Sequence, residues 1–557
     1  MIKVEEINSN LLINFMLEKC SSKKIYYVHN LTFEMFVFIK YLMDEKIKFK
    51  MISANKTIYS AEIFYKKKII KLRCSYRLTM LPLSKLAELA DIKEKSIFPY
   101  TILNNELKEN ISIEENMFKD KLEYSNFAKI YGLQINTFKI LEEYCKNDAL
   151  ITKNSIIKYW QIILESGFKK KKNILTAAKL SITNFFQNNI IIKQKIKLKY
   201  DRILRKDYFG GRTEVFGNPL DDEILLHYDW SGMYAQCMCE NVLGGEIFDS
   251  NIITDISNPG FYWIQFEQNL EIPVLPIKKN KLLFANGTFE GWYWFEEIIL
   301  AIENGVKIKK IKKTISAQYY DKFIKNFVEI NNKIREISPL HKQIGKNNNN
   351  TFYGRLGMNP EKEEEEITNI IENKKYIRTI EQNGIYIGYS KKEKSISNIL
   401  ISASITSKAR IKLYRGMKEI IKNGGRILYT DTDSIIASFK KNRYEKVLNV
   451  KLGEIFFDKN KEDTIIIDGV FAMPKTYAIK YINNSEIVKI KGFNTKPTFT
   501  EFKEKFYKKE NIITENTEWN KKDFQIKFIK KEKETNLNQL DKRIWDHTLK
   551  FTYPIQM

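Results

Sequence analysis

RILYTDTDSIIASF, residues 426–439, places two carboxylates one residue apart between two apolar runs. Ile427–Tyr429 and Ile435–Ala437 are strand candidates, and the polar TDTD between them predicts the bend of a β-hairpin. Asp431 and Asp433 would then lie at its tip and project to the same side. Two like charges this close favour a bound divalent cation, because otherwise one carboxyl must raise its pKa and stay protonated. A solvent-exposed turn is the alternative that this motif leaves open by itself.

A second acid follows an apolar strand in HYDWSGMYAQCM, residues 227–238. The run Ile224–Tyr228 ends in Asp229, and a helical pattern begins at Ser231. An acid at the end of a strand, before a helix N-terminus, is placed to ligate a metal while nearby backbone amides face an anion. The segment alone equally permits Asp229 to cap the helix.

A third segment, HKQIGKNNNNTFYGRLG at 341–357, contains an asparagine run but has helical spacing. On a helix, Lys346, Asn350 and Tyr353 fall on one face at i, i+4 and i+7. Gly354 follows, where the helix is free to change course. The face offers an ammonium, an amide and an aromatic ring, which suit the phosphates and the base of a nucleoside triphosphate.

The composition points to a polyanionic partner. The 557 residues include 93 Lys and Arg against 68 Asp and Glu, a formal net charge of +25. Such a charge repels itself unless something neutralises it, and nucleic acid is the first candidate. An anionic membrane surface is the second, but no run approaches the roughly 18 apolar residues of a spanning helix. Drift in an AT-rich genome also produces an excess of Lys, Ile and Asn. The positive charge alone therefore does not decide between a nucleic-acid partner and such drift.

The cysteines and the N-terminus bear on the compartment. Five cysteines are scattered without a CxxC or His-x-Cys pair, which argues against a zinc site and a disulfide scaffold and fits a reducing compartment. The start MIKVEEINSN has neither an Arg-rich amphipathic stretch nor a hydrophobic one, so it is typical of neither a transit peptide nor a signal peptide. If the protein works in an organelle, we expect it to be made there.

The periodicity predicts a mixed α/β chain of two or three domains without internal repeats. Strand-like runs alternate with helical patterns up to about residue 165, and residues 200–290 are rich in strands. Residues 296–357 and 396–422 are predicted to be helical.

Three charged stretches suggest surface segments. The basic run GFKKKKN, 167–173, is either a domain boundary or a solvated turn. The acidic run EKEEEE, 361–366, is predicted to be an exposed loop. After about residue 500 we predict a small, basic, partly helical subdomain.

Taken together and in order, the three acid- and lysine-bearing segments resemble motifs A, B and C of family B DNA polymerases. The family patterns DxxSLYP, KxxxNSxYG, YxDTDS and KxY have counterparts in DWSGMYA (229–235), KNNNNTFYG (346–354), YTDTDS (429–434) and KTY (475–477). Motif A departs from the family at Gly232, Met233 and Ala235, and motif B departs at Thr351. None of these departures removes a metal ligand or the lysine.

A further pattern is similar to the protein-primed subgroup, which is found in bacteriophages, adenoviruses and linear mitochondrial plasmids. Tyr208, Gly210 and Gly211 in DYFGGRTEVF resemble that subgroup's YxGG linker. The long insert at 245–340 is similar to the region where the subgroup carries its terminal-protein contact element. The resemblance extends from about residue 25 to 495.

The resemblance implies a metal centre for nucleotidyl transfer. Asp229 and Asp433 would bind two Mg²⁺ ions, with Mn²⁺ as a substitute and Asp431 close by. The Trp230 backbone carbonyl would be a further ligand. The partners implied are template and primer DNA, deoxynucleoside triphosphates and a terminal priming protein, with no membrane partner and a monomeric chain.

The same resemblance implies roles in nucleotide and DNA binding. Lys346, assisted by Arg335 and on the same face as Asn350, would neutralise the triphosphate. Tyr353 would pack by the nascent base pair, and Tyr234 would lie beneath the sugar and exclude a 2′-hydroxyl. Lys475 and Tyr477 would position the primer, and the linker residues would touch the template backbone. The DNA-binding set is Tyr208, Gly210, Gly211, Arg212, Lys475 and Tyr477.

The N-terminal region resembles an incomplete proofreading exonuclease. YVHNLTFEMFVF is similar to the second exonuclease motif with Glu34 in place of Asp, and YCKND, with Tyr144 and Asp148, is similar to the third. The first motif, DxE, would fall before Met1. A two-metal exonuclease that lacks two of four carboxylates neither binds nor activates its water, so we expect defective proofreading. Asp148 is alternatively a helix-surface acid, and Ser75 and Leu83 loosely resemble an element that binds single strands.

The expected architecture is an α/β (mixed α+β) right-hand polymerase with a truncated RNase H-like domain. Its expected segments are 1–165 (incomplete 3′–5′ exonuclease-like domain), 166–215 (linker with YxGG), 216–300 (palm, first part), 301–425 (insert and fingers), 426–500 (palm, second part) and 501–557 (thumb).

The expected function is DNA-directed DNA synthesis for a linear plasmid or organellar element, in the mitochondrion. The rival from another class is a decayed plasmid remnant that binds DNA without polymerising. Decay is disfavoured because five motif residues are intact: Asp229, Asp431, Asp433, Lys346 and Tyr353. A reverse transcriptase would place two adjacent acids where this chain has DTD. An RNA-synthesising enzyme is disfavoured by Tyr234.

Overall fold

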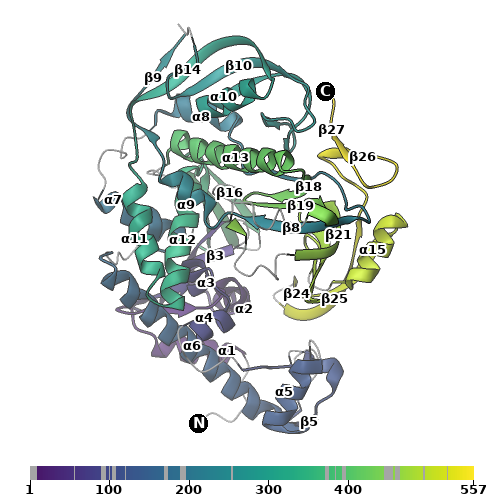
Figure 1. The fold of residues 1–557 in the computed structure, drawn as a ribbon. Helices are drawn as coiled ribbons and strands as arrows, with labels where there is room; N and C mark the ends of the chain where they lie inside the picture. Colours follow the sequence, from purple (N-terminus) through teal and green to yellow (C-terminus); the bar gives the residue numbers. More distant parts are fainter. Residues whose placement is uncertain are drawn as a thin grey trace.

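A computed structural model of the chain (Figure 1) shows helices and sheets mixed along its length, as the sequence predicts. No helix of the described residues has both the length and the apolar character needed to cross a membrane. The basic run at 169–173 lies outside the described residues. The described residues are 9–54, 57–89, 96–99, 101–102, 108–118, 121–168, 174–188, 196–251, 255–370, 376–382, 384–391, 397–443, 456–457, 465–493, 496–522 and 525–557.

The central sheet joins strands from distant parts of the chain. Its strand order is β23-β22-β21-β8-β19-β18-β7, and β20 (Phe456–Phe457) pairs with β8. The strands of this path are β7 (Thr213–Val215), β8 (Glu223–Asp229), β18 (Arg426–Asp431), β19 (Ser434–Lys440), β21 (Ile465–Met473), β22 (Thr476–Tyr481) and β23 (Glu486–Lys489). Leu225, Leu226 and Tyr228 of β8 are buried, which fixes the register of β8 against β19.

Helix α13 (Ile399–Lys422) lies between this sheet and a second one (Figure 1). Small residues such as Ser402, Ala403 and Ala409 are buried along it, so its neighbours approach closely on several sides. The second sheet has the order β13-β10-β14-β9. Its strands are β9 (Val242–Ser250), β10 (Phe261–Gln268), β13 (Gly287–Trp294) and β14 (Lys307–Asp321).

The helical prediction for residues 296–357 is wrong in its middle. Helices α10 (Phe295–Glu303), α11 (Lys325–Arg335) and α12 (Pro339–Leu356) are present, but β14 occupies the stretch between α10 and α11. Ile308 and Ile311 pack against the core of the second sheet, and β10 and β9 supply antiparallel partners. Ile308 and Ile311 are three residues apart, a spacing that also occurs on one face of a helix. The strand forms because β10 and β9, which are distant in sequence, supply its partners.

The N-terminal domain contains a third sheet, of order β1-β4-β3-β2-β15-β17-β16. Its strands are β1 (Ile25–Val28), β2 (Lys48–Ala54), β3 (Thr57–Tyr65), β4 (Lys68–Cys74), β15 (Glu363–Thr368), β16 (Arg378–Gln382) and β17 (Ile385–Lys391). The associated helices are α1 (Ser9–Lys19), α2 (Leu31–Asp44), α3 (Ser75–Thr79), α4 (Leu83–Leu89) and α6 (Thr137–Glu165). A small lobe contains β5 (Asn110–Ser112), α5 (Lys121–Tyr131) and β6 (Gln134–Asn136).

The acidic run 361–366 is therefore not a loop: most of it forms β15, between β2 and β17. Its charges have partners, since Glu363 pairs with Arg378 at 2.9 Å and Tyr376 donates a hydrogen bond to Glu366. Strands β15, β16 and β17, expected within the fingers, thus extend the N-terminal sheet.

The C-terminal region is partly helical, as predicted, and its other described elements are strands. Helix α15 (Phe499–Tyr507) is followed by the hairpin β24 (Asn511–Lys522) and β25 (Gln525–Asn536). The chain then returns through β26 (Arg543–Trp545) and β27 (Thr552–Pro554), and Phe551 bridges to Gly217 beside the central sheet. Three shorter helices complete the surroundings of the site: α7 (Ala177–Asn188), α8 (Leu198–Lys206) and α9 (Met233–Met238).

Candidate active site

The predicted hairpin with acids at its tip is present. Strands β18 and β19 pair antiparallel, and Asp431 opposite Ser434 is the last pair before the turn. Thr432 takes the left-handed conformation with φ 67°, and the Asp433 N–H donates to the Asp431 carbonyl at 2.8 Å. Both acids therefore lie on a tight, well-defined turn.

The end of β8 brings a third acid to the same sheet edge. Asp229 lies opposite Ser434 in the ladder, and the Trp230 N–H donates to the Asp433 carbonyl at 2.9 Å. Residues about two hundred positions apart in the sequence are thus joined by backbone hydrogen bonds. Helix α9 begins at Met233, two residues later than the sequence pattern predicts.

Asp431 and Asp433 differ in their electrostatic surroundings. The Asp431 Oδ1 accepts from the hydroxyls of Thr213 and Thr432 at 3.1 and 3.3 Å and lies 3.4 Å from the Lys475 ammonium. Burial raises the pKa of the Asp433 carboxyl, and the charge of Asp431 raises it further. A backbone hydrogen bond and the ammonium groups of Lys346 and Lys475 act in the opposite direction.

The donor set of this edge fits Mg²⁺ in chemistry, because carboxylates are the hard oxygen ligands that the ion prefers. Among the described residues, no three His, Cys, Asp or Glu side chains are arranged to hold one metal ion. Mg²⁺ in nucleotide sites is usually bound by one or two carboxylates, with substrate phosphates and water completing the shell. Asp229 and Asp433 would supply those one or two carboxylates, and a cation would relieve the mutual repulsion of Asp431 and Asp433.

Helix α12 presents the predicted face. Lys346 and Asn350 are exposed and Tyr353 is half-buried. The helix begins cleanly because the Ser338 side chain accepts from the His341 N–H and Pro339 occupies the first turn.

The asparagine run of α12 is not low-complexity filler. Asn348 and Asn349 are buried against α11, where Asn331 bonds to the side chains of both at 3.0 Å. Asn347 instead donates to the Thr79 carbonyl in the N-terminal domain at 2.8 Å. Asn350, which is exposed, remains on the Lys346 face.

Arg335 lies on α11 beside the preceding turn of α12. Its aliphatic stem packs over Gly345, and its guanidinium donates to Asn332 at 3.2 Å. The expectation that it assists Lys346 is untested by these contacts.

Two tyrosine rings stack where α9 meets α12. The Tyr234 and Tyr353 centroids are 4.3 Å apart with an angle of 8° between the planes. Burial raises the pKa of Tyr353 to about 12 and also raises that of Tyr234, so both hydroxyls stay protonated at neutral pH. Gly211 closes this space: a Cβ there would lie 2.8 Å from Thr432 Cγ2 and 3.0 Å from Tyr234 Oη. The glycine is needed for this close approach.

The YxGG loop is held in place by Arg410, which pairs with Glu297; the sequence analysis missed both residues. Arg410 on α13 donates to the carbonyls of Phe209 and Gly210 at 2.9 and 3.0 Å and pairs with Glu297 at 2.7 Å. The side chains of Arg410 and Glu297 are only 4% and 2% exposed. The available signal was a charged residue among the apolar positions of each of two helices, α10 and α13. The sequence could not show that the two charges pair, because they are 113 positions apart.

Arg212 does not lie where template contact requires. Its side chain is 2% exposed, pairs with Glu214 at 2.6 Å and donates to the Pro273 carbonyl. The guanidinium also lies over the Phe284 ring at 4.0 Å. The expectation that Arg212 touches DNA is therefore corrected: it anchors the start of β7.

The Tyr208 hydroxyl, partly buried, bonds to Ser402 at 2.8 Å.

Lys475 and Tyr477, the two positions of KTY that match the family pattern, differ in their exposure. The Lys475 side chain is 59% exposed and reaches toward Asp431. Tyr477 is 8% exposed and packs against Tyr429 with ring centroids 5.2 Å apart. Lys475 thus faces the site, whereas Tyr477 mainly supports it from the core.

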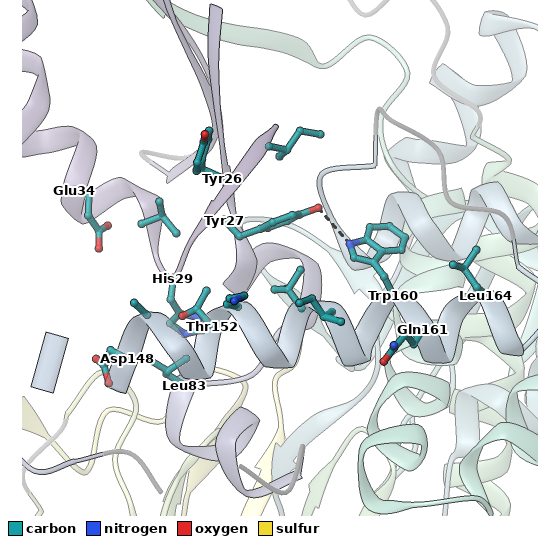
Figure 2. A pocket seen from close by; sticks show the side chains of 16 residues that line it. Tyr26, Tyr27, His29, Glu34, Leu83, Asp148, Thr152, Trp160, Gln161 and Leu164 are labelled. Atoms are coloured by element: carbon teal, nitrogen blue, oxygen red, sulfur yellow. Dashed lines mark hydrogen bonds between the residues drawn. The ribbon is translucent and has the colours of Figure 1, made fainter. Parts of the chain in front are cut away.

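The N-terminal domain contains a separate pocket of about 770 Å³ between β1 and α6 (Figure 2). Glu34 and Asp148, 114 positions apart, line the same end of it, as the exonuclease resemblance implies. Trp160 and Leu164 line the other end, where the Trp160 indole donates to the Tyr27 hydroxyl at 3.3 Å.

Of three other residues singled out in the exonuclease-like region, two lie outside this pocket and one lines it. Tyr144 belongs to the core of the neighbouring lobe, against Phe98 at 5.4 Å, rather than to the pocket. Ser75 is fully buried and its hydroxyl bonds to His29, so it offers no surface to a single strand. Leu83 lines the pocket from α4.

The chain is similar in sequence to DNA polymerases of a fungus and of a bacteriophage. The chain is 24% identical to a probable DNA polymerase of Neurospora intermedia over 92% of its own length and 58% of that protein's. It is 27% identical to the DNA-directed DNA polymerase of Enterobacteria phage PRD1 over 44% of its length and 46% of that protein's. The chain thus spans a little over half, or less, of these relatives.

Among solved structures, the fold is similar to that of Phi29 DNA polymerase complexed with primer-template DNA and incoming nucleotide. The TM-score is 0.67 at 17% identity, covering 94% of this chain and 92% of that one. The α/β right-hand architecture predicted from the motifs is therefore confirmed. Residues 17–434 match the sequence profile of the family described as DNA polymerase type B, organellar and viral. The chain belongs to the organellar and viral family of type B DNA polymerases.

Proposed function

We propose that this chain is a DNA-directed DNA polymerase that adds deoxynucleotides to a primer 3′-hydroxyl. The observation that carries the proposal is the meeting of two strand ends and one helix face. Asp229 and the Asp431–Asp433 turn share a sheet edge, and the Lys346 ammonium is close enough to lower the pKa of Asp433 against its burial. Acids that can hold metal ions and an ammonium that can meet phosphates are the groups that nucleotidyl transfer needs together.

In this mechanism, Asp229 and Asp433 would hold two Mg²⁺ ions, which supply charge stabilisation for the attacking 3′ oxygen and the leaving pyrophosphate. Lys346 binds the triphosphate and offsets its negative charge. The Asp431 side chain, fixed by Thr213 and Thr432, maintains the negative potential of the edge.

The substrates follow from the stacked tyrosines and the basic surface. Tyr353 packs by the new base pair, and Tyr234 beneath it leaves no space for a 2′-hydroxyl, which selects deoxynucleotides. The formal charge of +25 favours a polyanionic template. The similar Phi29 structure was solved with primer-template DNA and incoming nucleotide, which supports the same substrates here.

Protein priming and an organellar setting are finer parts of the proposal. The YxGG loop adjoins the DTD turn directly through Gly211 and Thr432, as a loop that guides the template toward the acids should. The family description includes organellar and viral members, which supports replication of a mitochondrial plasmid or a similar element. A terminal priming protein would be the macromolecular partner of a monomeric enzyme.

We also propose that the N-terminal domain of this chain does not proofread by itself. Among the described residues, Glu34 and Asp148 are the two acids that line its pocket. Two carboxylates are too few to bind two ions and activate a water for hydrolysis. Incubation with a primer that ends in a 3′ mismatch should therefore give no shortening, and rapid shortening would contradict this part.

The polymerase proposal is tested by incorporation of a labelled deoxynucleotide on a primed single-stranded template with Mg²⁺. The native chain should extend the primer, and Asp433→Ala should not, while both bind DNA with the same salt dependence. A native chain that binds primed DNA without extending it would overturn the proposal and favour the DNA-binding remnant.

A further inference from the structure

The turn that carries Lys475 has an unfavourable backbone conformation. β21 and β22 are joined by two residues, Pro474 and Lys475, with Met473 opposite Thr476. Lys475 has φ 64°, in the left-handed region that glycine or asparagine normally occupies in such a turn. Something outside the turn must therefore stabilise this conformation.

Tyr429 provides that stabilisation. Its Oη accepts a hydrogen bond from the Lys475 backbone N–H at 2.9 Å. The side chain of Tyr429 is buried, and its ring stacks on Phe471 with centroids 5.5 Å apart and a 14° angle. Because packing fixes the ring, the position of the hydroxyl is fixed as well.

The bond sets the direction in which the lysine projects. From this turn the Lys475 ammonium reaches 3.4 Å from Asp431 Oδ1 while most of its side chain stays exposed. An exposed ammonium beside the carboxylate turn is placed to meet a phosphodiester of the primer strand. If the turn relaxed, the ammonium would lose this fixed position.

We propose that Tyr429 is a positioning residue, whose hydroxyl holds the Lys475 turn so that the ammonium binds the primer strand next to the acids. This rests on the proposed polymerase function. It gives the tyrosine of YTDTDS a task that neither metal nor nucleotide binding explains, and it links two residues 46 positions apart in two different motifs.

The test is a double-mutant cycle with Tyr429→Phe and Lys475→Gln in the full chain. The readouts are primer-template affinity by fluorescence anisotropy in EDTA and steady-state extension with Mg²⁺. Tyr429→Phe should weaken DNA affinity and raise the KM for primer-template about threefold to tenfold, with kcat changed less than twofold. In the Lys475→Gln background, the same change should add nothing, because the ammonium that Tyr429 positions is gone.

Tyr414→Phe is the matched control, since it removes a hydroxyl of a buried α13 side chain that donates to the Ile272 carbonyl at 3.3 Å. Tyr414→Phe should lower the unfolding temperature by about as much as Tyr429→Phe does, but it should leave DNA affinity unchanged. Equal effects of Tyr429→Phe in both Lys475 backgrounds, or no effect in either, would overturn the inference. Because affinity is measured without metal, a chain that fails to extend a primer would refute the proposed function while the cycle still tests Tyr429.

Discussion

The Asp433 carboxyl is held where its charge is disfavoured. Burial and the neighbouring Asp431 raise its pKa, and the two ammonium groups nearby offset this only in part. A folded-state pKa above the unfolded value means that the ionised form weakens the folded state. That cost is absent below the unfolded pKa and grows as the pH rises toward neutrality. If Asp433 binds a cation as proposed, this cost in the metal-free chain is the expected consequence of its role.

Asp433→Asn should therefore stabilise the metal-free chain while abolishing primer extension. At pH 7 in EDTA we expect the melting temperature to rise by on the order of 1–3 °C. Differential scanning fluorimetry at pH 7 and pH 4.5 provides the measurement, and the gain should shrink at the lower pH. An unchanged or lower melting temperature at pH 7 would contradict the electrostatic argument.

Tyr234 should control the choice of sugar. Its ring lies flat against Tyr353, so Tyr234→Val opens space beneath the incoming sugar. Ribonucleotide incorporation relative to deoxynucleotide should rise about tenfold or more, as the ratio of kcat/KM values. Tyr234→Phe keeps the ring and should keep the discrimination. If Tyr234→Val selects sugars as well as the native chain does, another residue sets the selection.

At the scale of elements, α11 and α12 depend on a close contact at Gly345. A Cβ at this position would lie 2.5 Å from the Asn331 carbonyl oxygen and 2.6 Å from Arg335 Cγ. The asparagine bonds between the two helices share this interface. A glycine inside a helix normally weakens it, so the close approach is the reason for its presence.

Gly345→Ala should force the helices apart and destabilise the chain by about 1–3 kcal/mol. It should also raise the KM for the nucleotide, because Lys346 is the next residue. Gly354→Ala on the same helix meets nothing within 4 Å and is the control, with an expected gain of about 0.5–1 kcal/mol. Urea unfolding of both variants measures the difference, and equal stabilities would count against the packing argument.

Two elements also show why local patterns were insufficient. The lysine-rich β14 was predicted as helix and the glutamate-rich β15 as loop, yet each is a strand between two partners. Strand formation depends on neighbours that the local sequence does not contain. The predictions of helix α12, the hairpin β18–β19 and strand β8 are confirmed, because helical spacing, apolar runs and turn chemistry are local.

At the scale of the molecule, β15 joins the N-terminal domain to the rest of the chain. It pairs with β2 on one side and β17 on the other, and the Thr368 hydroxyl donates to the Phe49 carbonyl at 2.6 Å. Ile334, Leu340 and Ile344 from α11 and α12 also share a core with the N-terminal helices. The N-terminal domain therefore supports the helix that carries Lys346, whatever its own activity.

Ile367→Pro tests this connection, because it removes an N–H and places a ring in the middle of β15. Amide hydrogen exchange should speed up in both β2 and β17. Ile380→Pro in the outer strand β16 is the matched control and should affect only β16 and β17. Unchanged protection of β2 in Ile367→Pro would mean that the two parts fold independently.

The sequence by itself determined the acids, the lysine face and the family, because each motif is a run of a few residues whose chemistry and spacing are local. Asp229 and the Asp431–Asp433 turn share a sheet edge, and the Lys346 ammonium acts on the Asp433 carboxyl. Only the tertiary structure decided that Arg212 is buried, that Tyr144 lies outside the pocket lined by Glu34, and that the Tyr429 hydroxyl bonds to the Lys475 turn. These facts depend on which distant residues supply a counter-charge, a packing surface or a hydrogen bond, and such partners are set by the fold as a whole.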